Sequence, residues 1–374
     1  MNPQLEIIEN DAVTLQFVLS GLNLSLANGL RRTILSDIPL IVFRTTPTSE
    51  NKCIITTNTT RLNNEVIKQR LSCIPIHIKK QEEEEFPFQN LIMEVNVENT
   101  TDNIMFVTTE DFVIKDKTSG KVLPADDVRK IFPKDLITND YIDFVRLRPK
   151  ITDDLRGEKI HLTCELGMGT AKEDGMFNAV STCSYGFTVD PASQEEELAK
   201  KKQQWTDEEK TQEEINFEEQ NWRLLDAKRI YKKDSFDFIV ESIGVYDNVE
   251  IVHIACQMLI GSFQELGNII ERDEIEIKNS DSTMSNSYDV ILENHDYTIG
   301  KVLEYLLHTK YYETKMLTFC GFKKMHPHDS YSIIRVAYLE PVAKSGVKAN
   351  LLDCIRDAIN IYDQIDKHFQ KMMK

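Results

Sequence analysis

The histidine pair in His326-Pro327-His328 is the pattern in this sequence best suited to binding a metal ion. Neutral imidazole nitrogens are common zinc ligands, but a structural zinc site takes four ligands. No third or fourth ligand lies near this pair in the sequence, and the proline between the histidines favours a turn. The sequence therefore predicts no metal site. A metal-dependent hydrolase that uses His326, His328 and nearby acids remains an alternative, which metal analysis of the purified chain would test.

Carboxylates and thiols give no other pattern of catalytic chemistry. Phosphoryl transfer uses clustered aspartates that hold magnesium, whereas Asp126–Asp127 and Asp153–Asp154 are only neighbours in loop-like segments. We find no P-loop, nucleophile elbow or HExxH pattern. The seven cysteines are scattered without CxxC spacing, which indicates a reducing compartment and mostly buried thiols. The sequence predicts no catalytic site and no cofactor.

The composition is that of a globular chain with an acidic balance. The chain has 374 residues, enough for two or three domains, and 41% of them are hydrophobic. A net charge of −17 argues against broad nucleic-acid binding, which needs a basic surface. No stretch approaches the roughly 20 apolar residues that span a bilayer. The N-terminal MNPQLEIIENDAV lacks a basic region followed by an apolar run, so we predict no signal peptide.

The first elements expected are a strand at 13–19 and a helix at about 23–36, which Pro39 ends. Gly29 lies inside this helix, and Gly300 lies in a later one. A helical glycine costs about 1 kcal/mol relative to alanine. We therefore predict that another element approaches closely at both glycines.

The pattern of apolar and charged residues changes twice in the middle of the chain. From about 44 to 178, short β-like runs alternate with turns, and the glutamates Glu82–Glu85 are expected in a solvated loop. This pattern indicates a β-rich domain inserted into another fold. Strand character returns at 179–189. The strongly charged segment 192–233 is expected to be helical or mobile, with no predicted role beyond solubility or a partner contact.

Two long helices, at about 247–271 and 347–370, carry apolar residues at alternating steps of three and four, which is a heptad seam. Neither seam can bury itself alone, so we expect the two helices to pack against each other. The polar segment 272–287 between them is expected to be a linker. The seam residues are Val252, Cys256, Leu259, Phe263, Leu266, Ile270, Leu351, Ile355, Ala358, Tyr362, Ile365 and Phe369.

Two groups of segments resemble alpha-type RNA polymerase subunits. LSLANGLRRTILSDIP at 24–39 and TRLNNEVIKQRLSCIPIHI at 60–78 are similar to bacterial alpha and to the archaeal D-like and third-largest eukaryotic subunits. VRLRPK at 145–150 matches a later landmark of that family more loosely. ENHDYTIGKVLEYLL at 293–307 and FCGFKKMHPHDSYSIIRV at 319–336 resemble the archaeal L-like and eleventh eukaryotic subunits. Together the resemblance covers roughly 10–190 and 236–370.

The resemblance implies an α+β fold in which two alpha-type halves pair within one chain. The implied domains are a first half at 1–45 and 179–271, a β-rich insertion at 46–178 and a second half at 286–374. A single chain that joins both halves resembles the fused subunit of nucleocytoplasmic large DNA viruses. The abundance of Lys, Asn and Ile also fits an AT-rich viral genome. That resemblance implies the host cytoplasm, in viral factories, and packaging in the virion.

The family implies an assembly subunit without chemistry of its own. Its implied partners are the largest and second-largest polymerase subunits and small zinc-binding subunits, with no sequence-specific nucleic-acid binding and no membrane. Arg31, Arg32 and Asn28 lie on the helix that the family places near the second-largest subunit. An arginine fork suits such a contact because it pairs with carboxylates and carbonyls. Two exposed helix arginines are the plainer alternative.

Arg70, in the Arg-Leu-Ser-Cys-Ile-Pro segment, is expected either to contact a partner or to anchor the inserted domain. Relatives often carry a cysteine cluster in that domain, but only Cys53, Cys73 and Cys164 occur here, widely spaced, so a metal site in it is not expected. A free-standing coiled-coil adaptor outside any polymerase is the main alternative function. It predicts that 286–374 engages a foreign helix, whereas the polymerase hypothesis predicts that it engages 247–271.

Overall fold

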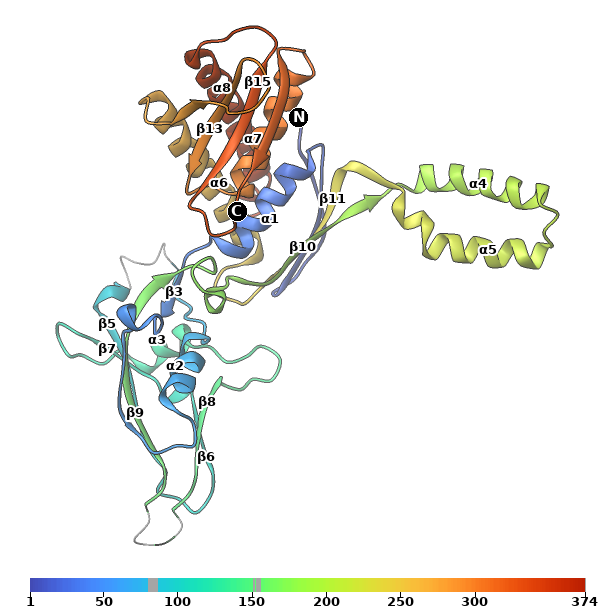
Figure 1. Ribbon diagram of the computed structural model, residues 1–374. Coiled ribbons are helices and arrows are strands. Elements are labelled where there is room, and N and C mark those ends of the chain that lie inside the picture. The colour runs from blue at the N-terminus through green and yellow to red at the C-terminus, as the bar shows by residue number, and fades with distance from the viewer. Residues whose placement is uncertain (80–86, 151, 153–155, 374) are drawn as a thin grey trace. The chain divides into compact units, whose positions relative to one another are not determined.

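The computed structural model describes residues 1–79, 87–150, 152 and 156–373. The predicted loop at Glu82–Glu85 and the pair Asp153–Asp154 lie outside the described residues. The chain divides into two compact units, which are coloured by residue number in Figure 1. Unit 1 comprises Met1–Thr33, Thr182–Val240 and Val252–Lys374, and unit 2 comprises Ile34–Ser181 and Glu241–Ile251.

Unit 1 contains a first four-stranded sheet in the order β1-β2-β11-β10. In β2 the residues alternate between buried and half-buried, as expected for a strand with one face on a core. Phe17 of β2 stacks on Phe238 of β11 with ring centroids 4.9 Å apart. The elements are β1 (Gln4–Asn10), β2 (Thr14–Ser20), β10 (Val180–Val189), β11 (Tyr231–Ser242), α1 (Leu24–Ser36) and α6 (Asn248–Glu271).

A second four-stranded sheet of unit 1 has the order β12-β13-β15-β14. Helix α7 packs against β14, β15 and α8. It begins at a true N-cap, because the Asp296 carboxylate accepts a hydrogen bond from Thr298 N at 2.9 Å. The elements are β12 (Ile277–Asn279), β13 (Ser287–Glu293), α7 (Tyr297–Leu307), β14 (Leu317–Lys323), β15 (Tyr331–Tyr338) and α8 (Lys344–Gln370).

The two sheets of unit 1 share one topology. Along the chain, each has an edge strand, a second strand, a helix, two further strands and a long helix. If β1, β2, β10 and β11 are matched with β12, β13, β14 and β15, both sheets have the same strand order. Helix α1 then matches α7, and α6 matches α8. Such agreement in order and connection is the structural signature of an internal repeat.

Unit 2 is built on the long strand β9, which pairs with β3, β4 and β5, while β7 pairs with β5 and β6 pairs with β8. Four phenylalanines form the aromatic centre of its core, and Phe112 contacts three of them: Phe43, Phe132 and Phe144. The elements are β3 (Leu40–Phe43), β4 (Cys53–Asn58), α2 (Asn64–Ser72), β5 (Leu91–Glu98), β6 (Met105–Thr108), β7 (Val113–Asp116), α3 (Ala125–Ile131), β8 (Asp143–Leu147) and β9 (Lys159–Gly169).

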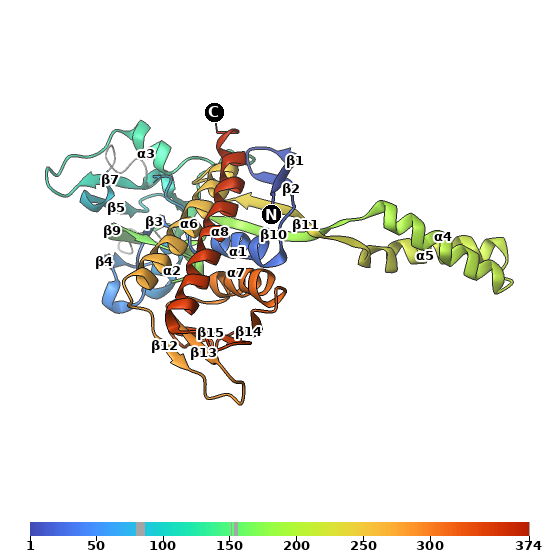
Figure 2. The same ribbon diagram turned by 90° about the horizontal axis from the view of Figure 1, so that it is seen from above.

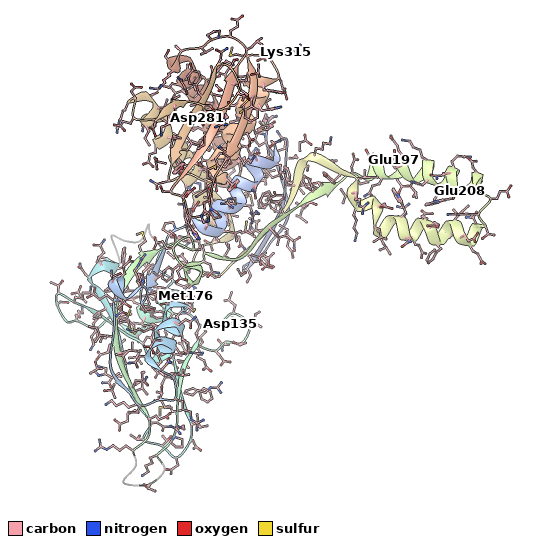
Figure 3. All side chains as sticks on the ribbon, in the orientation of Figure 1. Asp135, Met176, Glu197, Glu208, Asp281 and Lys315 are labelled. Atoms are coloured by element: carbon pink, nitrogen blue, oxygen red, sulfur yellow. The ribbon has the colours of Figure 1, made fainter. Side chains whose placement is uncertain are left out.

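The charged segment 192–233 contains a hairpin of two helices, α4 (Pro191–Asp207) and α5 (Gln212–Leu224), which extends from the ends of β10 and β11. Figure 3 labels Glu197 on α4 and Glu208 at the C-terminal end of that helix. The hairpin has its own small core of Leu198, Trp205, Ile215, Trp222 and Ala227. Thr211 and Glu214 form a capping box that starts α5.

Several sequence predictions differ from the structure in detail. Asp126 and Asp127 lie in the first turn of α3, not in a loop, and pair with Arg129 and Lys130. The segment 272–287, expected to be only a linker, contains β12, which pairs with β13. Helices α2 and α3 and strands β1, β3 and β6 were not anticipated. Each of these is short or lies at a sheet edge, so its sequence period is weak.

Candidate functional site

Helix α1 passes very close to α7 and α8 at Gly29. A Cβ added there would lie 2.6 Å from the Tyr362 hydroxyl and 3.6 Å from the carbonyl oxygen of Thr298. The Tyr362 hydroxyl donates to the carbonyl oxygen of Leu26 at 3.1 Å. Burial raises the pKa of this phenol, so it stays a neutral donor. The predicted close approach at Gly29 is confirmed.

The close approach predicted at Gly300 is also confirmed. A Cβ added to this residue of α7 would overlap the ring of Phe322 on β14. Because no side chain fits that space, glycine lets the helix lie directly on the sheet. Gly261 of α6 is a contrasting case, since an added Cβ there meets nothing within 4 Å.

Arg32 of α1 reaches the start of α7. Its Nε donates to Thr298 Oγ1 at 2.9 Å, and its Nη2 lies 2.7 Å from Asp296 Oδ2. The two charged side chains are 33% and 29% exposed. The guanidinium therefore bridges two helices that lie more than 260 residues apart in sequence, instead of projecting free from α1.

Arg31 and Asn28 differ from Arg32 in their surroundings. Arg31 Nε donates to Asn28 Oδ1 at 3.0 Å, and across the described ranges Arg31 forms no ion pair. Burial raises the pKa of the Cys183 thiol on β10 to about 12. The positive charge of Arg31 acts in the opposite direction and lowers that pKa. Arg31 is half-buried and keeps terminal nitrogens for a further acceptor.

Arg70 of α2 is held within unit 2. Its Nε donates to the carbonyl oxygen of Phe144 at 2.7 Å, and its Nη2 donates to that of Asp143 at 2.9 Å. The side chain thus fixes α2 to β8. Two roles were predicted for Arg70: a contact with a partner, and an anchor of the inserted domain. These hydrogen bonds correspond to the second role.

The twelve residues predicted for the seam are all buried. Phe263 of α6 stacks on Tyr362 of α8 with ring centroids 6.1 Å apart, and Gly267 lies against Ile355. Figure 2 shows α6 and α8 running alongside each other. Phe369, at the end of α8, contacts Phe17 of β2 edge to face at 5.3 Å. The seam therefore continues from α6 onto the first sheet.

A buried polar cluster in this seam was missed by the sequence reasoning. Asp366 of α8 is fully buried and accepts hydrogen bonds from His253 Nδ1, Gln257 Nε2 and Gln370 Nε2 at 2.6–2.7 Å. Asp366 follows Tyr362 by four residues, so it lies on the same helical stripe. A charged residue within the apolar face of a helix must be hydrogen-bonded when it is buried. Asp366 was therefore the signal in the sequence that could have indicated a polar partner on the facing helix.

The cysteines and histidines form no metal site in the described parts of the chain, where no group of three or more His, Cys, Asp or Glu could hold an ion. Cys53 and Cys164, far apart in sequence, are direct neighbours in the register of β4 and β9, while Cys73 is exposed elsewhere. His326 and His328 lie in the turn between β14 and β15, and His328 N donates to His326 Nδ1 at 3.2 Å. In the part of the chain that is described, no helix has the length and apolarity to cross a bilayer.

The contacts of Gly29, Arg32, Gly300 and the seam residues are made between helices or between a helix and a sheet. The family model "RNA polymerase Rpb3/Rpb11 dimerisation domain" matches residues 16–263. The chain therefore belongs to this family, whose alpha-type members are subunits of DNA-directed RNA polymerases.

Named relatives agree with this assignment. The chain is 27% identical to the RNA polymerases I and III subunit rpac1 of Dictyostelium discoideum, over 49% of this chain and 52% of that protein. It is 24% identical to human RPAC1, over 50% and 55%. It is also 24% identical to the Arabidopsis thaliana RNA polymerases IV and V subunit 3B, over 52% and 60%. The chain thus spans somewhat more than half the length of the relatives it matches.

Proposed function

We propose that this chain is a non-catalytic assembly subunit of a multisubunit DNA-directed RNA polymerase, with both alpha-type halves in one polypeptide. The observation that carries the proposal is the repeated topology of unit 1, in which both sheets have the same strand order. The family match at 16–263 includes β10, β11 and most of β2 of the first sheet, while β1 precedes it. Contacts through Gly29, Arg32 and Tyr362 join the first set of elements to the second.

The proposed pairing is intramolecular. The first half, 1–45 and 179–271, supplies β1, β2, β10, β11, α1 and α6, and the second half, 286–374, supplies β13–β15, α7 and α8. Support comes from the burial of the seam residues of α6 and α8. The proposed insertion at 46–178 falls wholly within unit 2. Strand β12 precedes residue 286 but pairs with β13, so the second half begins slightly earlier than the sequence indicated.

The proposed partners are the largest and second-largest polymerase subunits and small zinc-binding subunits. Arg31 is the residue best placed to contact the second-largest subunit, since Arg32 and Arg70 are engaged inside their own units. The presence of both halves in one chain supports a role in viral transcription, in viral factories of the host cytoplasm and in the virion, as in large DNA viruses.

The test is to tag the chain, purify it from its native source in gentle salt and identify what co-purifies. Recovery of the two large polymerase subunits near one-to-one is expected. Recovery of the chain alone would contradict the proposal and favour the adaptor alternative. Metal analysis of the same preparation tests the hydrolase alternative, which requires stoichiometric metal at His326 and His328.

The variant Arg31→Ala tests whether this single residue contacts the second-largest subunit. We expect it to lower recovery of the second-largest subunit at raised salt, because it removes a charged fork without disturbing an internal ion pair. Lys233→Ala, on the exposed part of β11, is a matched loss of charge that should leave recovery unchanged. Equal recovery with both variants would remove Arg31 from the interface.

A further inference from the structure

A cavity of about 600 Å³ lies in unit 2, between the loop after β4, the loop before β6, and strand β8. Its inner wall is apolar: Phe144, Val145 and Leu147 of β8 are buried behind it, and Ile104, 59% exposed, lies at its edge. A cavity of this size and lining is typical of ligand-binding sites. None of the contacts assigned above to assembly uses it, apart from Arg70, which forms part of its wall.

The cavity is positively charged in a strongly acidic protein. Its lining includes four arginines, Arg61, Arg70, Arg146 and Arg148, but only two acids, Asp143 and Glu158. The lining therefore has a formal charge of +2, against −17 for the whole chain. Arg61 forms no ion pair with any residue that the structure describes. An anionic group that enters the cavity would meet a net positive charge from the described lining residues.

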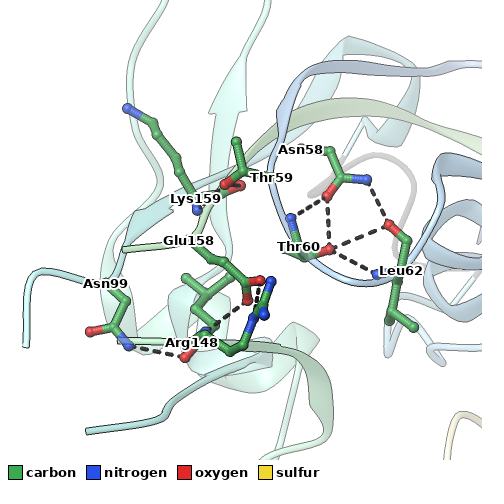
Figure 4. Close-up of polar contacts among 9 residues, drawn as sticks. Asn58, Thr59, Thr60, Leu62, Asn99, Arg148, Glu158 and Lys159 are labelled. Carbon is green, nitrogen blue, oxygen red and sulfur yellow. Dashed lines mark hydrogen bonds and ion pairs between the residues drawn. The ribbon is translucent and has the colours of Figure 1, made fainter. Parts of the chain in front are cut away.

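Hydrogen bonds hold the two loops of the cavity in place. Figure 4 shows that Asn58 accepts from the backbone and hydroxyl of Thr60 and donates to the carbonyl of Leu62, at 2.8–3.0 Å, which fixes the turn that carries Arg61. The same Asn-Thr-Thr sequence recurs at 99–101. There the fully buried Asn99 donates to the carbonyl of Leu147 at 2.9 Å and thus ties the Ile104 loop to β8.

A buried ion pair sets the orientation of a third arginine. Glu158, with 8% of its side chain exposed, accepts from Arg148 Nε at 2.5 Å and from Arg148 N at 2.8 Å. Arg146 lies over the ring of Phe106, with its guanidinium carbon 4.8 Å from the ring centre, and its Nη2 lies 3.6 Å from Asp143 Oδ2 in an exposed ion pair. Preorganised positive groups around an apolar hollow are what an acidic peptide with an apolar anchor residue requires.

We propose that this cavity is a docking site for an acidic, extended segment of a partner protein, with one aliphatic or aromatic side chain inserted between Ile104 and β8. Arg61 and Arg146 contact the carboxylates that flank the anchor. The segment is a peptide and not a nucleic acid, because the inner wall of the cavity is apolar and suits an aliphatic or aromatic side chain. The proposal concerns unit 2 alone and does not depend on the assembly role of unit 1.

A random dodecapeptide display library selected against the full-length chain tests the proposal. Because the chain has a net charge of −17, non-specific selection would enrich basic peptides. We expect the opposite: enriched peptides rich in Asp and Glu around one Leu, Ile, Val or Phe. Enrichment of basic or uncharged peptides would overturn the proposal.

Fluorescence anisotropy with the most enriched peptide then locates the site. Arg61→Glu should weaken binding at least tenfold, and Ile104→Ser should weaken it severalfold, while both variants keep the parent melting temperature because both side chains are exposed. Lys121→Glu, an exposed charge reversal elsewhere in unit 2, should change affinity less than twofold. Equal affinity of the Arg61→Glu variant and the parent would overturn the proposal. So would Arg61-dependent binding of a fluorescent twenty-nucleotide oligo-dT instead of the peptide.

Discussion

The two sheets of unit 1 have the same strand order but carry very different connections. In the first, most of unit 2 lies between α1 and β10, and the α4–α5 hairpin lies between β10 and β11. In the second, the corresponding connections are a short π-helical turn after α7 and the His326–His328 turn between β14 and β15. The framework therefore accommodates long connections, which we propose are insertions, at two points of one copy, since these points lie at strand and helix ends.

The comparison separates two kinds of surface. The elements that recur in both copies carry the contacts between sheets and helices, such as those of Tyr362 and Gly300. The elements present in one copy alone lie in the insertions, where the arginine-lined cavity and the hairpin are found. We infer that the repeated framework provides stability, while the insertions of the first copy provide surfaces for partners.

The largest expected effect is at the buried carboxylate that joins the long helices. Asp366→Ala removes an acceptor of three hydrogen bonds, and we expect it to lower the free energy of unfolding by about 3 kcal/mol. Urea denaturation of this variant, of His253→Ala and of the double variant gives the coupling between α6 and α8. Additive losses would mean that the two side chains do not interact, contrary to the account.

Glycine substitutions within helices test the close packing of the second copy. Gly300→Ala should cost about 2 kcal/mol, because the new methyl group would overlap the Phe322 ring. Gly261→Ala is the matched control: it should be neutral or stabilising by up to about 1 kcal/mol, since nothing lies near its added Cβ. Thermal melts with the same sign for both substitutions would show that α7 does not lie on β14 as described.

A smaller effect is expected for the bridge between α1 and α7. Arg32→Ala should destabilise by about 0.5 kcal/mol, because both charges of the pair are partly exposed to solvent. A double-mutant cycle with Asp296→Ala, measured at low and high salt, should show a coupling that weakens with salt. If Arg32→Ala instead left stability unchanged and abolished subunit recovery, Arg32 would be a partner contact, the role proposed for Arg31.

The smallest effect is expected for the hairpin. Replacing residues 191–229 with Asn-Gly should shift the melting temperature by less than about 2 °C, because α4 and α5 have a core of their own. The short turn can close, since Asp190 N already donates to the carbonyl of Ile230 at 3.3 Å. A loss of folding on deletion would show that the hairpin supports the sheet.

The elements with strong periodicity could be predicted from the sequence. The heptad steps gave the long helices and their buried residues, and the cost of helical glycine pointed to Gly29 and Gly300. The partners of Arg32, and the partners of Asp366 on α6, could not be predicted, because they lie more than 100 positions away in the sequence. The register that brings Cys53 to Cys164, and the turns that place Arg61 and Ile104 at one cavity, likewise depend on tertiary pairing.

The pairing of the two halves is the central claim, and separating them tests it most directly. Residues 1–273 and 274–374, divided after α6 and before β12, would be co-expressed as two chains with a tag on the second. The account predicts a one-to-one complex in native mass spectrometry, which Gly29→Trp disrupts because it blocks the contact with Tyr362. Recovery of the tagged fragment alone, folded but without the first fragment, would contradict it.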